Sequence, residues 1–470
     1  MEILIKAAQM ILILSIIVVL HEGGHYAAAK FFKTKVERFF LFFDVKFALF
    51  KKKIGDTVYG IGWLPLGGYV KIAGMVDESM DTEQLKQPAQ PWEFRSKPAW
   101  QRLIIMLAGI IVNLLLAMII FGVMSYSNGE QFINVNKLTN GIVVDSAQTA
   151  MGLKPGDVPV GVNGINYTKL NEISKRALID GGELDVKRNG EIVHLPITEE
   201  ALVSMLEHKG GFFAPNVPII IDTVFDVAAQ AGLQKGDKMI SLNNEPINGW
   251  KKVSETIAAN ANSNLLFQVE RNGEIKNISV AVPAEAKVGI GPDFDLTGVV
   301  DSEEFGVAES IKRGVNLTFS TITDQVQSFG VLWRLKGKAS KYVSGPIGIA
   351  QQLPPAWDWG FFWSFTALLS AWLAFVNLLP IPGLDGGHAM FTIYEMVTGH
   401  KPGDKFMEIM QIVGFIFLMA LMVFCRFNSV EPKSTKRKYT PFASCRLFQK
   451  VKDAFCTTSP PISGKVLAPK

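Results

Sequence analysis

The chain has 470 residues, which is too long for one ordinary domain. Its hydrophobic content of 48% is high for a soluble protein and low for a bundle made only of membrane helices, so we expect membrane helices combined with soluble modules. The net charge of +4 gives no argument for a nucleic-acid partner. All three cysteines lie near the C-terminus, where they cannot form a disulfide framework for the modules upstream.

The first predicted element is an apolar segment, Ile3–Leu20, which runs into the motif His21-Glu22-x-x-His25. The segment is long enough to cross most of a bilayer. On a helix the motif places two imidazoles on one face, one turn apart, as two zinc ligands require, and the carboxylate between them can deprotonate a water. Ionisable residues at membrane depth mark function by default. The alternatives are a chance motif and a cleaved signal peptide, which the poorly basic start and the lack of a cleavage site before His21 disfavour.

The second predicted span is Leu103–Met124. The segment between the first two spans is rich in Lys and Arg, which places it in the cytoplasm by the positive-inside rule. Within it, Thr57–Ile72 alternates apolar residues with Gly and Pro, which predicts a short hairpin close to the histidines. Such a hairpin could hold a substrate backbone as an added strand. The alternative is an amphipathic hairpin that rests on the membrane.

The region after the second span contains an internal repeat. Gly152–Asp157 recurs as Gly232–Asp237, and Arg188–Glu191 recurs as Arg271–Glu274, an Asn-Gly turn between two strands. Two similar units of mostly strands with one helix are therefore expected. The repeated string followed by an apolar strand resembles the PDZ family, whose members bind peptides at a sheet edge. In the first copy Pro159 lies within the strand and predicts an irregular edge there.

The third predicted span, Phe361–Leu379, opens with aromatic residues typical of a membrane interface, and the fourth is Phe406–Phe424. A buried core helix is the alternative for each. Between them, the prolines and glycines of Asn377–His388 end a helix at membrane depth. Non-helical backbone at this depth is tolerated only where it faces protein or a wet cavity. A catalytic zinc needs three protein ligands and one open position, and Asp385 supplies a third ligand of the right type. His388 is a competing candidate, and a simple helix cap is the alternative role for Asp385.

These motifs in this order resemble the site-2 protease family of zinc intramembrane metalloproteases, and within it the bacterial regulator-of-sigma-E protease (RseP) branch with two PDZ domains. The resemblance extends from near Leu4 to about Phe424. It implies that the cofactor is Zn²⁺, bound by His21, His25 and Asp385, with Glu22 as the catalytic base. It implies further residues that bind substrate or support the site: Asn377, Asn113, Pro380, Pro382, Gly67 and Gly68.

We therefore expect a multi-pass α-helical membrane protein with about four transmembrane helices and two inserted β-rich PDZ-like domains. The expected domains are a first part of the membrane core at 1–127, PDZ-like domains at 128–205 and 206–285, a connecting segment at 286–356, a second part of the core at 357–425, and a tail at 426–470.

The expected function, from the resemblance, is zinc-dependent cleavage of the transmembrane segments of single-pass proteins, such as anti-sigma factors or signal-peptide remnants. The protein would lie in the bacterial inner membrane, with the PDZ-like domains periplasmic and the active site toward the cytoplasm. Expected partners are substrate helices, the lipid bilayer and peptide termini at the PDZ-like domains, without nucleic acid. A basic cluster in the tail, Lys433–Lys438, conflicts with this orientation. The alternatives are a metal transporter and a membrane-bound PDZ scaffold without catalysis.

Overall fold

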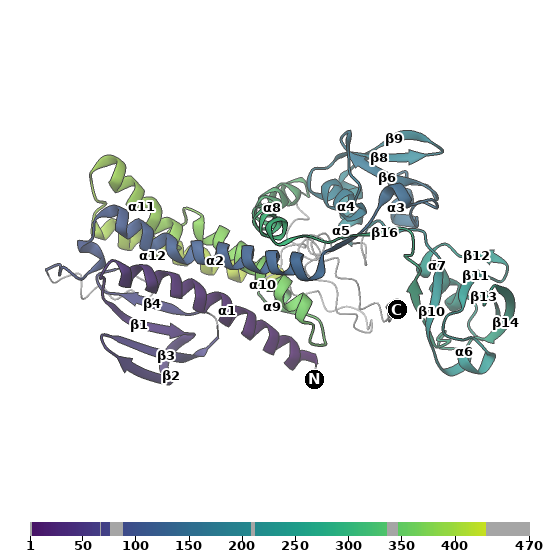
Figure 1. Ribbon diagram of the computed structural model, residues 1–470, viewed down its shortest axis with the longest axis horizontal. Helices are drawn as coiled ribbons and strands as arrows, with labels where there is room; N and C mark the ends of the chain where they lie inside the picture. The colour runs from purple at the N-terminus through teal and green to yellow at the C-terminus, as the bar shows by residue number, and fades with distance from the viewer. Residues whose placement is uncertain (1, 66, 76–87, 208–211, 336–345, 429–470) are drawn as a thin grey trace. The chain divides into compact units, whose positions relative to one another are not determined.

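The computed structural model describes residues 2–65, 67–75, 88–207, 212–335 and 346–428 (Figure 1). The chain divides into two compact units. We call the described parts of Met1–Gly129 and Glu304–Gln449 the helical unit, and Glu130–Glu303 the inserted unit. The expected tail lies outside the described residues beyond Asn428.

The helical unit contains long helices and one small sheet. Its elements in chain order are α1 (Glu2–Phe31), β1 (Val36–Leu41), β2 (Phe43–Ile54), β3 (Thr57–Leu64), β4 (Tyr69–Ile72), η2 (Phe94–Ser96), α2 (Ala99–Asn128), α8 (Val307–Arg334), α9 (Pro346–Gln351), α10 (Trp359–Leu378), α11 (Asp385–Thr398) and α12 (Asp404–Asn428).

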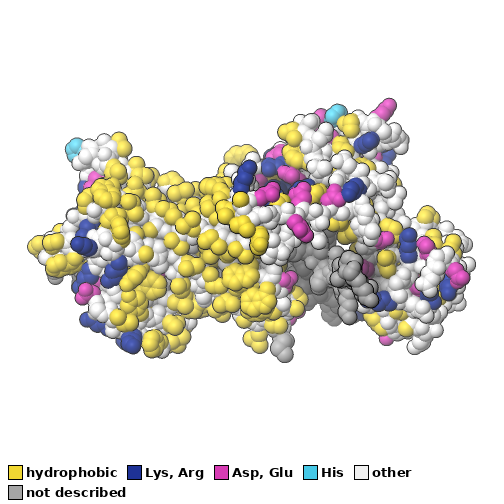
Figure 2. Space-filling model, in the orientation of Figure 1, with side chains coloured by type: hydrophobic (Ala, Val, Ile, Leu, Met, Phe, Trp, Pro, Cys, Tyr) yellow, Lys and Arg dark blue, Asp and Glu magenta, His cyan; other side chains and the backbone are white. Residues whose placement is uncertain are grey.

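Within the described residues, three helices, α1, α2 and α10, are long and apolar enough to cross a membrane by length and composition. They cover the first three predicted spans, and α12 contains the fourth predicted segment, Phe406–Phe424. Figure 2 shows hydrophobic side chains over much of the visible face of the helical unit, while Lys and Arg gather around the end that carries β1–β4. A surface of this kind suits lipid contact, because an apolar face of this extent is unusual in a soluble monomer.

Helix α2 is the centre of the helical unit, because it packs against α1, α8, α10 and α11. Between α1 and α10 the core contains Ile13, Ile17 and Phe362, all nearly inaccessible to solvent. Between α2 and α10 the buried residues Ala117 and Ala371 allow a close approach. Small residues at such contacts are typical of helices that pack in membranes.

Helix α8 also packs closely on α2, although it is not among the three apolar helices. It turns small residues toward its neighbours, and a Cβ on Gly314 would lie 2.8 Å from the backbone nitrogen of Gly122. Its large apolar residues, including Ile311 and Phe319, are exposed. The described part of the segment expected as a connection, 286–356, therefore contains a long structured helix as well as short elements.

The small sheet has the strand order β2-β3-β1-β4. The prediction of a hairpin within Thr57–Ile72 is wrong, because β3 and β4 do not pair with each other. They lie on either side of β1, which pairs with β3 in parallel and with β4 antiparallel. The hairpin of this sheet joins β2 to β3, with Ile54 opposite Thr57 and Gly55 at a φ of 60° in the turn. Strand β4 is therefore the end strand of the sheet.

The inserted unit is rich in short strands. Its elements in chain order are β5 (Glu130–Ile133), η3 (Val135–Lys137), α3 (Ser146–Ala150), β6 (Val158–Val162), β7 (Ile165–Asn166), α4 (Leu170–Ile179), β8 (Gly182–Arg188), β9 (Glu191–Ile197), α5 (Glu199–Glu207), β10 (Ile219–Val224), α6 (Asp226–Ala231), β11 (Lys238–Leu242), β12 (Glu245–Pro246), α7 (Gly249–Ala259), β13 (Asn264–Arg271), β14 (Glu274–Ala281), β15 (Ile290–Phe294) and β16 (Val300–Glu303).

The two sequence repeats form two sheets. The first has the order β7-β6-β8-β9, and the second has the order β14-β13-β11-β10-β15 with β12 paired to β11. The second sheet thus includes β15, from the segment expected as a connection. The unit begins and ends in one ladder, since β5 and β16 pair antiparallel with Glu130 opposite Glu303. Its two ends are therefore adjacent.

Each repeat contains an equivalent ion pair between a buried aspartate and an arginine. Arg188 donates to both carboxylate oxygens of Asp157 at 2.8 and 2.7 Å, and Arg271 donates to both oxygens of Asp237 at 2.6 and 2.7 Å. Each arginine also donates to a backbone carbonyl of the turn after the preceding helix, that of Gly152 or Gly232. Bidentate pairs of this kind fix geometry as well as charge.

The register of β6 shifts between Pro159 and Gly161, in agreement with the predicted irregularity. Proline is not its cause, however. Strand β11 shifts between Met239 and Ser241, the equivalent positions of the second repeat, where there is no proline. The bulge is therefore a property of the repeat, and Pro159 occupies a position at which the ladder is already interrupted.

The Asp237–Arg271 pair generates a prediction about pH. Burial alone raises the pKa of Asp237, but hydrogen bonds from Arg271 and from the Gln234 backbone outweigh burial, so that the pKa lies below its usual value. The pair therefore stabilises the fold above the unfolded carboxyl's pKa of about 4, and the stabilisation is lost as pH falls through the folded value. We expect Asp237→Asn to destabilise the second repeat by about 3 kcal/mol at neutral pH.

Hydrogen exchange of the β11 and β13 amides in the purified full-length protein measures this effect. The difference between wild type and Asp237→Asn should shrink as the pH is lowered below about 4. Asp157→Asn is the matched control, because it should affect β6 and β8 and leave the second repeat protected. A difference in β11 and β13 that does not depend on pH would contradict the assignment.

Candidate functional site

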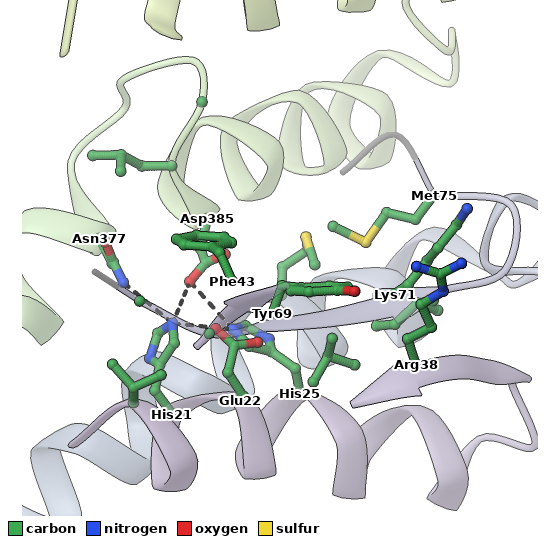
Figure 3. Close-up of a pocket in the computed structure, with 18 of the residues that line it drawn as sticks. His21, Glu22, His25, Arg38, Phe43, Tyr69, Lys71, Met75, Asn377 and Asp385 are labelled. Carbon is green, nitrogen blue, oxygen red and sulfur yellow. Dashed lines mark hydrogen bonds and ion pairs between the residues drawn. The ribbon is translucent and has the colours of Figure 1, made fainter. Parts of the chain in front are cut away.

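The two histidines of the first motif meet Asp385 inside the helical unit. His21 and His25 lie one turn apart in α1 and are buried, and Asp385 is the first residue of α11. The Nε2 atoms of the histidines are 3.3 Å apart, and Asp385 Oδ2 lies 3.1 Å from that of His21 and 3.3 Å from that of His25. Figure 3 shows the three side chains pointing toward one another.

These three atoms have the spacing of zinc ligands. Tetrahedral zinc with bonds of about 2.0–2.2 Å places neighbouring ligand atoms about 3.3–3.6 Å apart, close to the separations of 3.1–3.3 Å found here. The Oδ2 atom of Asp385 is buried and accepts no hydrogen bond from any described residue, which is costly for a carboxylate unless a cation lies beside it. Three such atoms form one face of a tetrahedron and leave the fourth position open.

The second nitrogen of each imidazole is also held. His25 Nδ1 lies 2.8 Å from the carbonyl oxygen of Ile105, to which it donates, so Nε2 keeps its lone pair for a metal. His21 Nδ1 lies 3.2 Å from the side-chain amide of Asn113, and His21 Nε2 lies 3.2 Å from that of Asn377. A neutral imidazole accepts at one nitrogen only. When Nε2 binds a metal, Nδ1 carries the proton and Asn113 accepts it through Oδ1, an atom otherwise without a partner.

Glu22 points into the same site from α1. It lies next to His21 in sequence, and its carboxylate lies near the backbone N–H of Val70 in β4. Since β4 is the end strand of its sheet, this N–H is available to a group outside the ladder. The small sheet therefore reaches the histidines through one edge strand.

Two glycines let α1 and α2 approach closely enough to form the site. A Cβ on Gly24 would lie 2.6 Å from the carbonyl oxygen of Ala108. A Cβ on Gly109 would lie 2.8 Å from His21 Cε1 and 2.8 Å from His25 Cδ2. Real Cβ atoms do not come this close, so the rings of both histidines occupy the space that a side chain at Gly109 would need.

Asp385 is presented by an irregular loop. Helix α10 ends at Leu378, residues 379–384 are not helical, and Asp385 begins α11. The sequence predicts Asp385 within the unwound segment, whereas the structure places it just after this segment, with Leu384 as the N-cap residue of α11. Pro380 and Pro382 lie in the loop and not among the residues that line the cavity described below.

The start of α11 is packed against this loop and tied to α2. A Cβ on Gly386 would lie 2.5 Å from the carbonyl oxygen of Leu378, and one on Gly387 would lie 2.5 Å from that of Ile381. Farther along α11, Glu395 accepts a hydrogen bond of 2.5 Å from Arg102 of α2 in a largely buried pair. The helix that carries Asp385 is thus fixed at both ends relative to the histidines.

A cavity of about 670 Å³ opens onto the three ligands. It receives side chains from every element around the site. Its lining includes Leu14, Val18, His21, Glu22 and His25 of α1; Arg38, Phe43, Asp44 and Val45 of β1 and β2; Gly67, Gly68 and Tyr69–Ile72 near β4; Met106 of α2; Leu373 and Asn377 of α10; Gly383, Leu384, Asp385 and His388 around the start of α11; and Gln411 of α12.

The structure thus brings together Glu22, His21, His25, Asp385 and Asn377. Asn113 is fully buried behind His21 and does not line the cavity. The competing ligand His388 lines the cavity but is not part of the described group of three ligand atoms.

An aromatic stack that the sequence analysis missed forms one wall of the cavity. Tyr69 stacks between Phe40 and Phe43, with interplanar angles of 10° and 7°. Figure 3 shows Phe43 beside Asp385. Gly67 and Gly68 make this possible, since a Cβ on Gly67 would lie 2.9 Å from the Phe43 ring. The aromatic residues of β1 and β2 carried no motif, so no sequence signal singled them out.

The sequence matches the model of peptidase family M50 over residues 9–421. The chain belongs to this family. Among similar proteins, zinc metalloprotease RasP of Geobacillus kaustophilus is 30% identical over 92% of this chain and 99% of its own length. The regulator of sigma-E protease RseP of Escherichia coli is 25% identical over 90% of this chain and 97% of its own length. The regulator of sigma E protease of Haemophilus influenzae is 27% identical over 91% of this chain and 99% of its own length.

Membership of family M50 makes the chain a zinc-dependent intramembrane metalloprotease, as the resemblance implied. It decides against the alternatives of a metal transporter and of a scaffold without catalysis. The apolar helices and the bacterial relatives make it a bacterial inner-membrane protein.

The close approach of α1 and α2 generates a prediction about metal binding. Gly109→Ala should displace both imidazoles and lower zinc affinity by a factor of about 10–100, the size of effect seen when ligand orientation is lost. Gly24→Ala should act in the same direction by separating the helices. Elemental analysis and a competitive zinc chelator measure both effects on purified protein.

Gly23→Ala is the matched control for this prediction. It lies in the same motif, but a Cβ there meets no atom within 4 Å, so zinc content should be unchanged. Full zinc occupancy in Gly109→Ala would show that the rings are not held by this contact.

Proposed function

We propose that this M50 peptidase cleaves peptide bonds within the transmembrane segments of single-pass membrane proteins, with zinc held by His21, His25 and Asp385. The observation that carries the proposal is the triangle of buried ligand atoms at the base of a cavity between apolar helices. The substrate classes that the resemblance implies are anti-sigma factors and signal-peptide remnants. Two relatives are named regulator of sigma E protease, which is in keeping with the first class.

The bound zinc supplies Lewis acidity that polarises the scissile carbonyl and lowers the pKa of water. Glu22 takes the proton from the attacking water and passes it to the leaving nitrogen. Its carboxylate is oriented for this by the Val70 N–H. The Ile105 carbonyl and Asn113 hold the two imidazoles in the tautomer that a ligand requires.

A transmembrane helix hides its peptide bonds behind its own hydrogen bonds, so the substrate must unwind locally before it is cut. We propose that the unwound segment lies along β4, the end strand that lines the cavity, as an added strand. The cavity walls from Phe43 and Tyr69 would then exclude water beside the reacting bond. Asn377, beside His21 Nε2, would bind the substrate near the scissile carbonyl.

We propose four membrane spans, with α12 as the fourth, and an orientation that follows the Lys and Arg content between α1 and α2. The segment with β1–β4 is then cytoplasmic, and the inserted unit is periplasmic. The two repeats of the inserted unit would be PDZ-like domains. In the second repeat β15 ends the sheet, and its outer edge pairs with no described strand, so a peptide terminus could add there.

Glu22→Gln tests the chemistry. It keeps the shape of the side chain and removes the proton acceptor, so zinc should stay bound while cleavage falls by a factor on the order of 10² or more. The measurement is the rate at which purified protein in detergent cuts a single-span substrate, alongside zinc content. Glu2→Gln on the same helix is the matched control, because the Glu2 carboxylate lies away from the site and pairs, among the described residues, with Lys6 at 3.3 Å. Cleavage by Glu22→Gln near the wild-type rate would reject the role of this carboxylate.

Deletion of the inserted unit separates gating from recruitment. Because Glu130 and Glu303 lie opposite each other in one ladder, residues 130–303 can be replaced by a short linker between Gly129 and Glu304. If the unit filters substrates by size, the deletion variant should cut substrates that still carry a folded outer domain. If it recruits substrates, the variant should cut every substrate more slowly.

We favour gating, because the unit is inserted between two spans on the side expected to face away from the zinc. The comparison uses two substrates with the same transmembrane segment, one with its outer domain and one trimmed. A zinc-loaded deletion variant that no longer cuts the trimmed substrate would refute gating.

A further inference from the structure

The side chain of Gln411 has no role in the fold that the described residues reveal. Among the described side chains of α12, Gln411 is the one that lines the cavity. It is 8% exposed and forms no hydrogen bond with any described residue. We propose that the Gln411 amide binds the backbone of the unwound substrate segment and so positions the scissile bond. The inference rests on the proposed function and adds a substrate-binding residue to it.

Gln411 faces the cavity from a largely apolar helix. Polar residues within apolar membrane helices are retained for function by default. Gln9 of α1 shows the structural alternative within this chain. It is also buried, and its Nε2 donates to the carbonyl oxygen of Pro354 at 3.2 Å, while its Oε1 has no hydrogen-bond partner among the described residues. Unlike Gln411, it does not line the cavity.

Helix α12 is seated firmly enough to place Gln411. One turn after it, Gly414 contacts the backbone of the loop that leads to Asp385. A Cβ at Gly414 would overlap the carbonyl group of Pro382 and would lie 3.0 Å from the nitrogen of Gly383. The same face of α12 thus touches the ligand-bearing loop through Gly414 and the cavity through Gln411.

The chemistry of the amide suits a peptide backbone. A carboxamide offers one acceptor oxygen and two N–H donors. It can therefore replace the hydrogen-bond partners that a peptide bond loses when its helix unwinds. Of the other two amides described near the site, Asn377 is the one proposed above to bind the substrate near the scissile carbonyl. Asn113 is fully buried behind the His21 ring and does not reach the cavity. Gln411 can therefore replace a hydrogen bond that the substrate helix gives up, and unsatisfied backbone groups are costly at membrane depth.

Gln411→Met is the direct test, because methionine keeps the length and flexibility of the side chain without the amide. In purified full-length protein we expect unchanged zinc content and an unchanged melting temperature, with kcat/KM for a single-span substrate lowered roughly tenfold, the effect of losing one or two hydrogen bonds. Gln9→Met is the matched control. It removes a buried amide elsewhere in the membrane helices and should leave kcat/KM near wild type.

A set of substrates with single backbone esters separates binding from packing. Each ester replaces one amide within three residues of the scissile bond and removes its N–H. At the position that Gln411 contacts, the ester substrate should lower kcat/KM of the wild-type protein about as much as Gln411→Met lowers kcat/KM for the all-amide substrate. In Gln411→Met, the same ester should lower kcat/KM by less than a further twofold. At the other positions the two changes should be additive.

The outcomes are distinct. Additive effects at every position, an unchanged kcat/KM in Gln411→Met, or loss of its zinc would each overturn this inference, the last by showing that the amide supports the site itself. If wild type shows no chelator-sensitive cleavage of the parent substrate, the proposed function fails and this inference fails with it. Normal cleavage by wild type together with an unaffected Gln411→Met overturns the role of Gln411 alone.

Discussion

The close contact between α1 and α2 at Gly24 and Gly109 is the constraint on which the site depends. Both histidine rings lie in the space above Gly109, so their position is set by the backbone of the neighbouring helix. The same contact brings the Ile105 carbonyl within 2.8 Å of His25 Nδ1. A helix crossing made by small residues is strong in a membrane because no side chain holds the backbones apart. The two imidazoles are thereby held by the fold itself, which would lower the cost of organising them as the proposed zinc ligands.

The polar groups of the site are tolerable at membrane depth because most have a partner. The imidazoles are held from behind by Ile105 and Asn113, and the Arg102–Glu395 pair closes the far side of α11. What stays without a hydrogen bond is Asp385 Oδ2, the atom that faces the two Nε2 atoms. The pattern of satisfied and unsatisfied groups therefore supports this position as the one that the proposed zinc ion would occupy.

The membrane helices and the candidate ligands could be predicted from sequence, because helical spacing pairs His21 with His25 and because Asp385 follows a helix broken by prolines. That Asp385 lies beside them rested on resemblance, since nothing in sequence spacing joins residues so far apart. The order of the small sheet could not be predicted. Pairing of β1 with β3 in parallel requires a crossover, and local alternation reports strands but not their neighbours. The stacked Phe40, Tyr69 and Phe43 were missed for the same reason, as they meet only once that order is formed.

Each of the two units uses one kind of contact several times, and the kind of contact differs between the units. In the inserted unit, each repeat fixes its turn with one buried Asp–Arg pair, whose attraction is large because the carboxylate is shielded from water. In the helical unit, glycines carry out the corresponding task by letting backbones meet: Gly24 and Gly109 between α1 and α2, and Gly386 and Gly414 around the loop before Asp385. Contacts between backbones need no charge and lose nothing in lipid.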